Sequence, residues 1–155
     1  MRALLPSALL VLVMAQPNMA TGMMPLYRSQ WDLAPILITV IFAAYLFALV
    51  PTLSTVGRPT ARSGWGWRIA AGVAAAVIAD LTMAIAADAA IASVARVAAG
   101  ISVGLVTGSI SGLALERLGE RGRTVMATAT MLGSAIGTMA AAGFAQYLPA
   151  PRVTV

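Results

Sequence analysis

Four glycines spaced four residues apart run through GISVGLVTGSISG, a stretch whose other residues are apolar or small. They are Gly100, Gly104, Gly108 and Gly112. In a helix surrounded by water, each would destabilise the helix by about 1 kcal/mol relative to alanine. In a bilayer, small residues let helix backbones approach closely, and helices associate there mainly through such packing. The row therefore predicts a tightly packed transmembrane helix.

The composition of the chain favours the same setting. Of its 155 residues, 60% are hydrophobic and 10% are charged, whereas about 25% of residues in a typical soluble domain are charged. Too few polar side chains remain to cover a surface facing water. We therefore expect an all-α fold, a polytopic membrane helix bundle with the lipid bilayer as its surroundings.

Five apolar segments approach the roughly 20 residues that a helix needs to cross a bilayer. The predicted spans of this single membrane domain (1–155) are 3–27, 33–50, 69–87, 90–115 and 125–148. Loops are expected at 56–68 and 116–124, and a tight turn near Asp88 separates the third span from the fourth.

The arginines indicate how the spans are oriented, because cytoplasmic loops of membrane proteins carry an excess of basic residues. With the N-terminus inside, seven arginines lie on the cytoplasmic side and two outside, while Arg96 lies within a span. The inner set is Arg2, Arg58, Arg62, Arg68, Arg117, Arg121 and Arg123, and the outer set is Arg28 and Arg152. We therefore predict a multi-pass protein with a cytoplasmic N-terminus and an outer C-terminus.

The first span has two interpretations. MRALLPSALLVLVMA resembles a secretory signal peptide, with a basic residue, an apolar run and small residues near Ala15. The apolar character continues through residue 27, which favours an uncleaved helix. Gln16, Pro17 and Asn18 in its middle predict a helix break that faces the protein interior, with Gln16 and Asn18 as candidate cavity residues.

Two ionisable residues, Asp80 and Arg96, fall within predicted spans. Each costs roughly 2.5–3.5 kcal/mol near the centre of a span, so each should have a partner or face water. They lie eight residues before and eight after Asp88, which predicts a similar depth and suggests an ion pair. Alternatively, Arg96 faces a polar cavity where it binds or gates an anionic group, while Asp80 carries a proton.

The fifth span repeats the small-residue pattern with Gly133 and Gly137. Either these glycines simply pack helices tightly, or they form smooth contacts over which helix pairs rock; the sequence leaves both open.

Residue types that are missing exclude several functions. The chain has no cysteine and no histidine, which excludes disulfides, Cys/His metal sites and histidine proton relays. We expect no enzymatic activity, no cofactor and no metal. The net charge of +5 is explained by loop arginines, so nucleic acid is not an expected partner.

Several segments, taken together, resemble the N-terminal half of a major facilitator superfamily transporter, in a bacterial drug-efflux-like member. GRPTARSGWGWR matches the family's cytoplasmic loop signature at Gly57, Arg62 and Gly64, although Ala61 replaces its aspartate. RVAAG resembles the fourth-helix signature R-x-x-x-G, and GSAIGTMAAAG resembles the antiporter motif at Gly133 and Gly137. In this stretch Thr138 replaces the motif's proline.

The resemblance implies transport of a small organic solute by proton-coupled efflux across the bacterial inner membrane. It implies that Arg96 lines a central cavity and that Gly57, Arg62 and Gly64 belong to a gating loop, without the aspartate of the family's charge latch. Five spans make an incomplete six-helix half. We therefore expect a truncated transporter, or a second membrane chain that supplies the missing helices. The rival hypothesis is a small structural or assembly protein that oligomerises through its glycine-rich faces.

Overall fold

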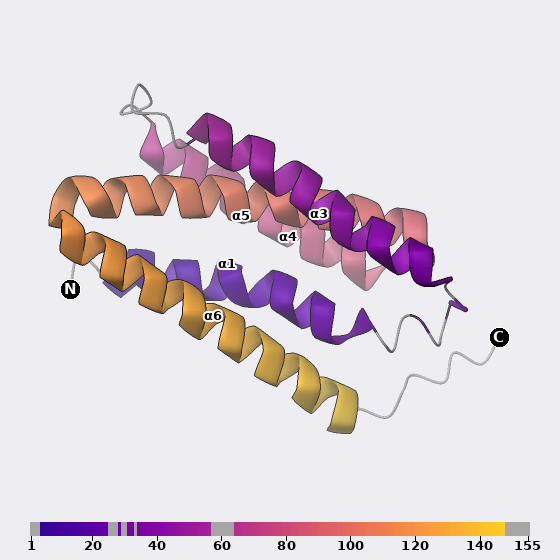
Figure 1. Cartoon of the computed structure of the whole chain (residues 1–155). Helices are drawn as coiled ribbons and strands as arrows, with labels where there is room; N and C mark the ends of the chain where they lie inside the picture. Colours follow the sequence, from indigo (N-terminus) through magenta and orange to yellow (C-terminus); the bar gives the residue numbers. More distant parts are fainter. Residues whose placement is uncertain (1–3, 25–27, 29–30, 33, 57–63, 148–155) are drawn as a thin grey trace.

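The computed structural model is a bundle of five helices (Figure 1). It describes all residues except 1–3, 25–27, 29–30, 33, 57–63 and 148–155, and the described part contains no strand. The helices are α1 (Leu4–Gly22), α3 (Pro35–Val56), α4 (Trp65–Ala84), α5 (Ala89–Leu118) and α6 (Glu120–Tyr147). The predicted all-α bundle is confirmed.

Four of these helices, α3 to α6, are long and apolar enough to cross a membrane. Their outer surfaces carry large apolar side chains, such as Phe47 at 79% exposure, Met139 at 74% and Leu81 at 63%. A monomeric soluble protein rarely exposes apolar surface on this scale, whereas lipid tails solvate it well. The chain is therefore a multi-pass membrane protein. The crossing of α1 stays a prediction.

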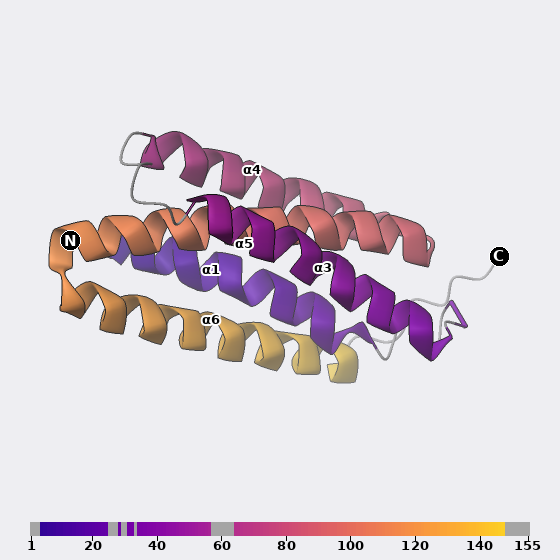
Figure 2. The same ribbon diagram turned by 45° about the horizontal axis from the view of Figure 1, so that its top comes forward.

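Helix α5 lies at the centre of the bundle. It packs against α3 and α4 on one side and against α1 and α6 on the other (Figure 2). Its Val103, Val106 and Ile110 join Leu10 and Val13 of α1 in the main apolar core. Residues of α5 are consequently in contact with every other helix of the bundle.

The glycine row of α5 faces α3. A Cβ atom added at Gly100 would collide with the backbone oxygen of Tyr45, and one at Gly104 would lie 2.7 Å from the Thr52 side chain. Gly108 approaches Val56 in the same way. The row ends at Gly112, where the neighbour is the Trp65 ring at the start of α4. The two backbones can be this close only because these positions lack side chains.

Gly133 and Gly137 of α6 face α1 instead of α5. A Cβ atom at Gly133 would lie 2.5 Å from the backbone oxygen of Val11, and one at Gly137 would collide with the Ala15 backbone. The bundle thus contains two glycine-lined pairs, α3 with α5 and α1 with α6. All six predicted packing glycines are covered by other helices of the same chain.

Both predicted loops are shorter than expected. The loop predicted at 116–124 is almost entirely helical, because α5 continues to Leu118 and α6 begins at Glu120. Glutamate and arginine are good helix formers, and the reversal is confined to Gly119, whose φ of 57° and ψ of −137° suit a residue without a side chain. Within 56–68, Trp65 to Arg68 already belong to α4.

The predicted helix break in α1 is wrong, because α1 runs without interruption through Pro17. Proline removes one backbone N–H, but polar side chains stabilise the surrounding turns. The Asn18 side-chain amide donates to the Met14 oxygen at 2.8 Å, and the Thr21 hydroxyl donates to the Pro17 oxygen at 2.8 Å. Hydroxyl groups and neighbouring helices commonly make proline tolerable in membrane helices in this way.

Candidate functional site: a buried arginine between two cavities

Arg96 lies in the second turn of α5 and is only 3% exposed. Its guanidinium donates to the backbone oxygen of Pro17 at 3.1 Å and to the Thr21 hydroxyl at 3.3 Å. Both acceptors belong to α1, so α1 holds the arginine head group in place. The Nε atom is buried and has no hydrogen-bond partner.

Two aromatic rings of α3 cover the guanidinium. Its central carbon lies 5.0 Å from the ring centre of Tyr45 and 5.3 Å from that of Phe42. A cation over an aromatic face is stabilised by about 0.5–2 kcal/mol, more where water is excluded. The residues are three apart in α3 and therefore project from the same face of that helix.

A cavity of about 20 Å³ lies on the α4 side of Arg96, lined in part by Gln16, Pro17 and Asp80. The Gln16 amide donates to the Ala76 oxygen at 3.2 Å and also interacts with the Asp80 carboxylate. Its Oε1 atom is buried without a partner, like Nε of Arg96. A cavity of this size has room for about one water molecule.

A larger cavity of about 220 Å³ lies on the α3 side of Arg96. Its lining combines the arginine with the two rings and with polar groups of α1: Pro17, Asn18, Thr21, Phe42, Tyr45, Leu46 and Arg96. The Asn18 amide also reaches the Ser134 hydroxyl of α6 at 3.3 Å. The arrangement offers one fixed cation beside aromatic surface, which suits a small solute with an anionic group and an apolar part.

The structure brings together the four candidate cavity residues, Gln16, Asn18, Asp80 and Arg96, around these two cavities. The predicted Asp80–Arg96 ion pair is wrong. Within the described residues, no carboxylate lies within salt-bridge distance of Arg96, and the ion pair seen there joins Arg123 to Glu120 at 3.3 Å. Arg96 turns instead toward α1 and the rings of α3.

The position of Asp80 explains why it needs no cationic partner. Helix α4 ends at Ala84, so Asp80 lies about 6 Å from its end at 1.5 Å per residue. The predicted span continued to residue 87 and placed the carboxylate deeper. Asp80 is exposed on the bundle surface, and its carboxylate interacts with the Gln16 side chain, which gives it a polar partner.

The absence of an ion pair predicts that the two charges contribute independently to stability. In a double-mutant cycle of Asp80→Asn and Arg96→Gln, the coupling energy is expected to stay below about 1 kcal/mol, because the two side chains line one small cavity without forming an ion pair. Reversible unfolding by SDS in detergent micelles measures each free energy of unfolding. A coupling energy several times larger, or recovery of stability when the two charges are swapped, would show that Asp80 and Arg96 do form an ion pair.

The predicted gating residues are only partly described. Gly57 and Arg62 lie outside the described residues. Gly64 is the N-cap of α4 with a φ of 103°, and a Cβ atom there would lie 2.8 Å from the Trp67 ring. Gly64 is therefore placed in a helix start at the opposite end of the bundle from Arg96, and nothing in the described residues connects it to the two cavities.

Sequence reasoning missed Thr21, Phe42 and Tyr45 as members of the site. The spacing of Phe42 and Tyr45 places them on one helix face, but nothing in the sequence pairs that face with Arg96. No group of three acidic side chains in the described part of the chain could hold a metal ion.

Comparison of the chain with protein-family models, curated proteins and solved structures finds no match.

Proposed function

We propose that this protein moves a small organic solute with an anionic group across the membrane, and that Arg96 binds the solute. It would act as a major-facilitator-type transporter or as part of one. The observation that carries the proposal is a buried cation that has no carboxylate partner among the described residues and borders a cavity of about 220 Å³.

A buried charge is costly unless it is paired, so the Arg96 site favours an incoming anion. The carbonyl of Pro17 and the hydroxyl of Thr21 hold the guanidinium but leave its positive charge uncompensated. The Phe42 and Tyr45 rings supply the apolar wall for the rest of the solute. Asp80, exposed on the other side of Arg96, is the candidate for carrying a coupled proton.

Transport is tested with the purified chain in proteoliposomes. We expect uptake of at least one class of radiolabelled aromatic carboxylates or sulfonates above that of protein-free liposomes, with amines and sugars as matched cationic and neutral solutes. Repeating the assay with an imposed pH gradient tests proton coupling. A folded, reconstituted protein that moves no anion in the panel would refute transport by this chain alone. If the purified protein also fails to bind any anion of the panel, the proposed role of Arg96 is refuted whether or not a second chain is needed.

For the orientation, we propose a bacterial inner membrane with the arginine-rich end of the bundle in the cytoplasm. Arg68, Arg117, Arg121 and Arg123 lie at the end where α4 begins and α5 meets α6 (Figure 1). Because the chain has no cysteine, Arg121→Cys and Ala87→Cys give single-cysteine reporters. A membrane-impermeant maleimide added to intact cells should label the second and spare the first; the reverse pattern would invert the topology.

A further inference from the structure

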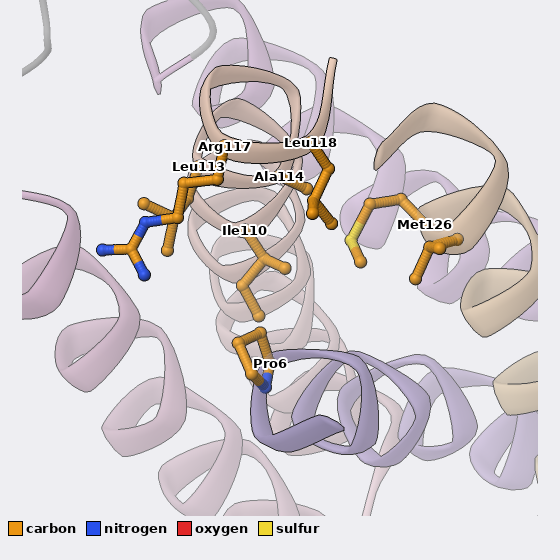
Figure 3. A pocket seen from close by; sticks show the side chains of 8 residues that line it. Pro6, Ile110, Leu113, Ala114, Arg117, Leu118 and Met126 are labelled. Carbon is orange, nitrogen blue, oxygen red and sulfur yellow. The ribbon is translucent and has the colours of Figure 1, made fainter. Parts of the chain in front are cut away.

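An apolar pocket of about 350 Å³ lies between α5 and α6 near their connection, with α1 at its base (Figure 3). Its interior is buried, with Ile110 at 1% exposure and Met126 at 7%. Leu118 and Val125 are exposed at its edge. The described lining residues are Pro6, Ile110, Leu113, Ala114, Arg117, Leu118, Val125 and Met126, of which Arg117 carries the charge.

The length of α5 places this pocket at the boundary between acyl chains and head groups. Thirty residues at 1.5 Å each give about 45 Å, which matches a bilayer including its head-group layers. Arg117 is the penultimate residue of α5, so its guanidinium lies at the level of lipid phosphates. Ile110, seven residues earlier, lies about 10 Å deeper, at the level of the acyl chains.

The charges around the pocket favour an anion over a zwitterion. Arg117, Arg121 and Arg123 lie in one short segment that also holds Glu116 and Glu120, so the segment keeps a net charge of +1. Glu120 forms an ion pair with Arg123. Arg117 itself extends from α5 at the pocket edge (Figure 3). Basic groups beside pockets between membrane helices attract anionic head groups, at about 1 kcal/mol per arginine near the surface.

We propose that this pocket binds one anionic phospholipid, with an acyl chain between Ile110, Ala114 and Met126 and its phosphate at Arg117. The lipid site is separate from the solute site, because Arg96 and Arg117 lie 21 residues apart in α5, which is about 31 Å. Its occupancy therefore does not depend on the proposed transport function.

The test is photocrosslinking in nanodiscs with phosphatidylglycerol that carries a diazirine on its acyl chain. Mass spectrometry is expected to locate the label on residues 110–126. Phosphatidylcholine with the same labelled chain should give about fivefold less product, the ratio that corresponds to about 1 kcal/mol of head-group attraction. Arg117→Gln should lower the phosphatidylglycerol labelling to the phosphatidylcholine level.

Matched variants separate the site from general electrostatics. Arg121→Gln removes an equal charge from the neighbouring turn without touching the pocket, and it should leave the labelling unchanged. Ala114→Phe fills the interior and should abolish labelling by both lipids; Val125→Trp, at the exposed edge, does the same where the first variant fails to fold. Equal labelling by the two lipids, equal loss in Arg117→Gln and Arg121→Gln, or labelling that survives both filling variants would overturn the proposal.

Discussion

Replacing Gly137 with alanine is expected to destabilise the bundle by about 2 kcal/mol. The new methyl group would collide with the Ala15 backbone, whose Cα atom would lie 2.8 Å away. A backbone cannot rotate aside as a side chain can, so α1 and α6 must separate, at an overpacking cost of up to ~3 kcal/mol. The better helix propensity of alanine returns about 1 kcal/mol. Reversible SDS unfolding of the purified protein, followed by circular dichroism, measures the difference.

Gly143→Ala in the same helix is the matched control. No atom lies within 4 Å of a Cβ atom placed at Gly143, so this variant gains the propensity of alanine without a collision. It should unfold at the wild-type SDS concentration or slightly above. If Gly137→Ala is as stable as Gly143→Ala, α1 and α6 do not pack through these glycines, and the α1–α6 pair of this fold is wrong.

The glycine spacing predicts close helix packing but does not identify the helices that pack. Gly100 and Gly137 have similar sequence surroundings, yet one contacts α3 and the other α1. A small residue allows another backbone to come close, but it does not determine which one, because any helix with a smooth face can pack there. The partners depend on how the whole chain folds, since Gly137 and Ala15 are far apart in the sequence.

The predicted ends of the membrane spans are wrong where polar residues extend a helix. The charges of Glu116 and Arg117 favour a loop, but both residues continue α5, which ends at Leu118. Conversely, the apolar residues Ile85 to Ala87 favour a continued span, but they follow the end of α4 at Ala84. Hydropathy reports solvation by lipid, whereas helix ends depend on backbone hydrogen bonds and caps, such as the Asp88 carboxylate that accepts from the Ile91 N–H at 2.8 Å.

The candidate site was predictable in its charged and amide residues but not in the way Arg96 is held. The sequence suggests a pair of Arg96 with Asp80 because both charges can be read directly from the residue types. Its actual partners are the Pro17 backbone oxygen and the ring of Tyr45. Every residue has a carbonyl group, so the sequence cannot indicate which backbone oxygen will accept a hydrogen bond. An aromatic residue in an apolar span can face either lipid or a cation, and the sequence does not distinguish the two.

Arg96 is therefore the residue whose replacement should affect transport most. Arg96→Gln removes the positive charge and leaves a shorter, neutral amide at this position. Hydrogen bonds to charged groups contribute about 1.5–3 kcal/mol, so we expect the KM for the transported anion to rise roughly 10- to 100-fold. Flux of that anion in proteoliposomes, corrected for the amount of folded protein, measures the change.

Arg96→Lys separates the charge from the geometry of the guanidinium. Lysine keeps the positive charge but lacks the planar fork that donates to Pro17 and Thr21 while lying over the rings of Phe42 and Tyr45. Anion transport should fall by less than in Arg96→Gln, and the preference for anions over neutral solutes should persist. Arg123→Gln, at an exposed arginine of α6, serves as the control and should transport normally. A folded Arg96→Gln protein with the wild-type KM would show that Arg96 stabilises α1 against α3 and does not bind the solute.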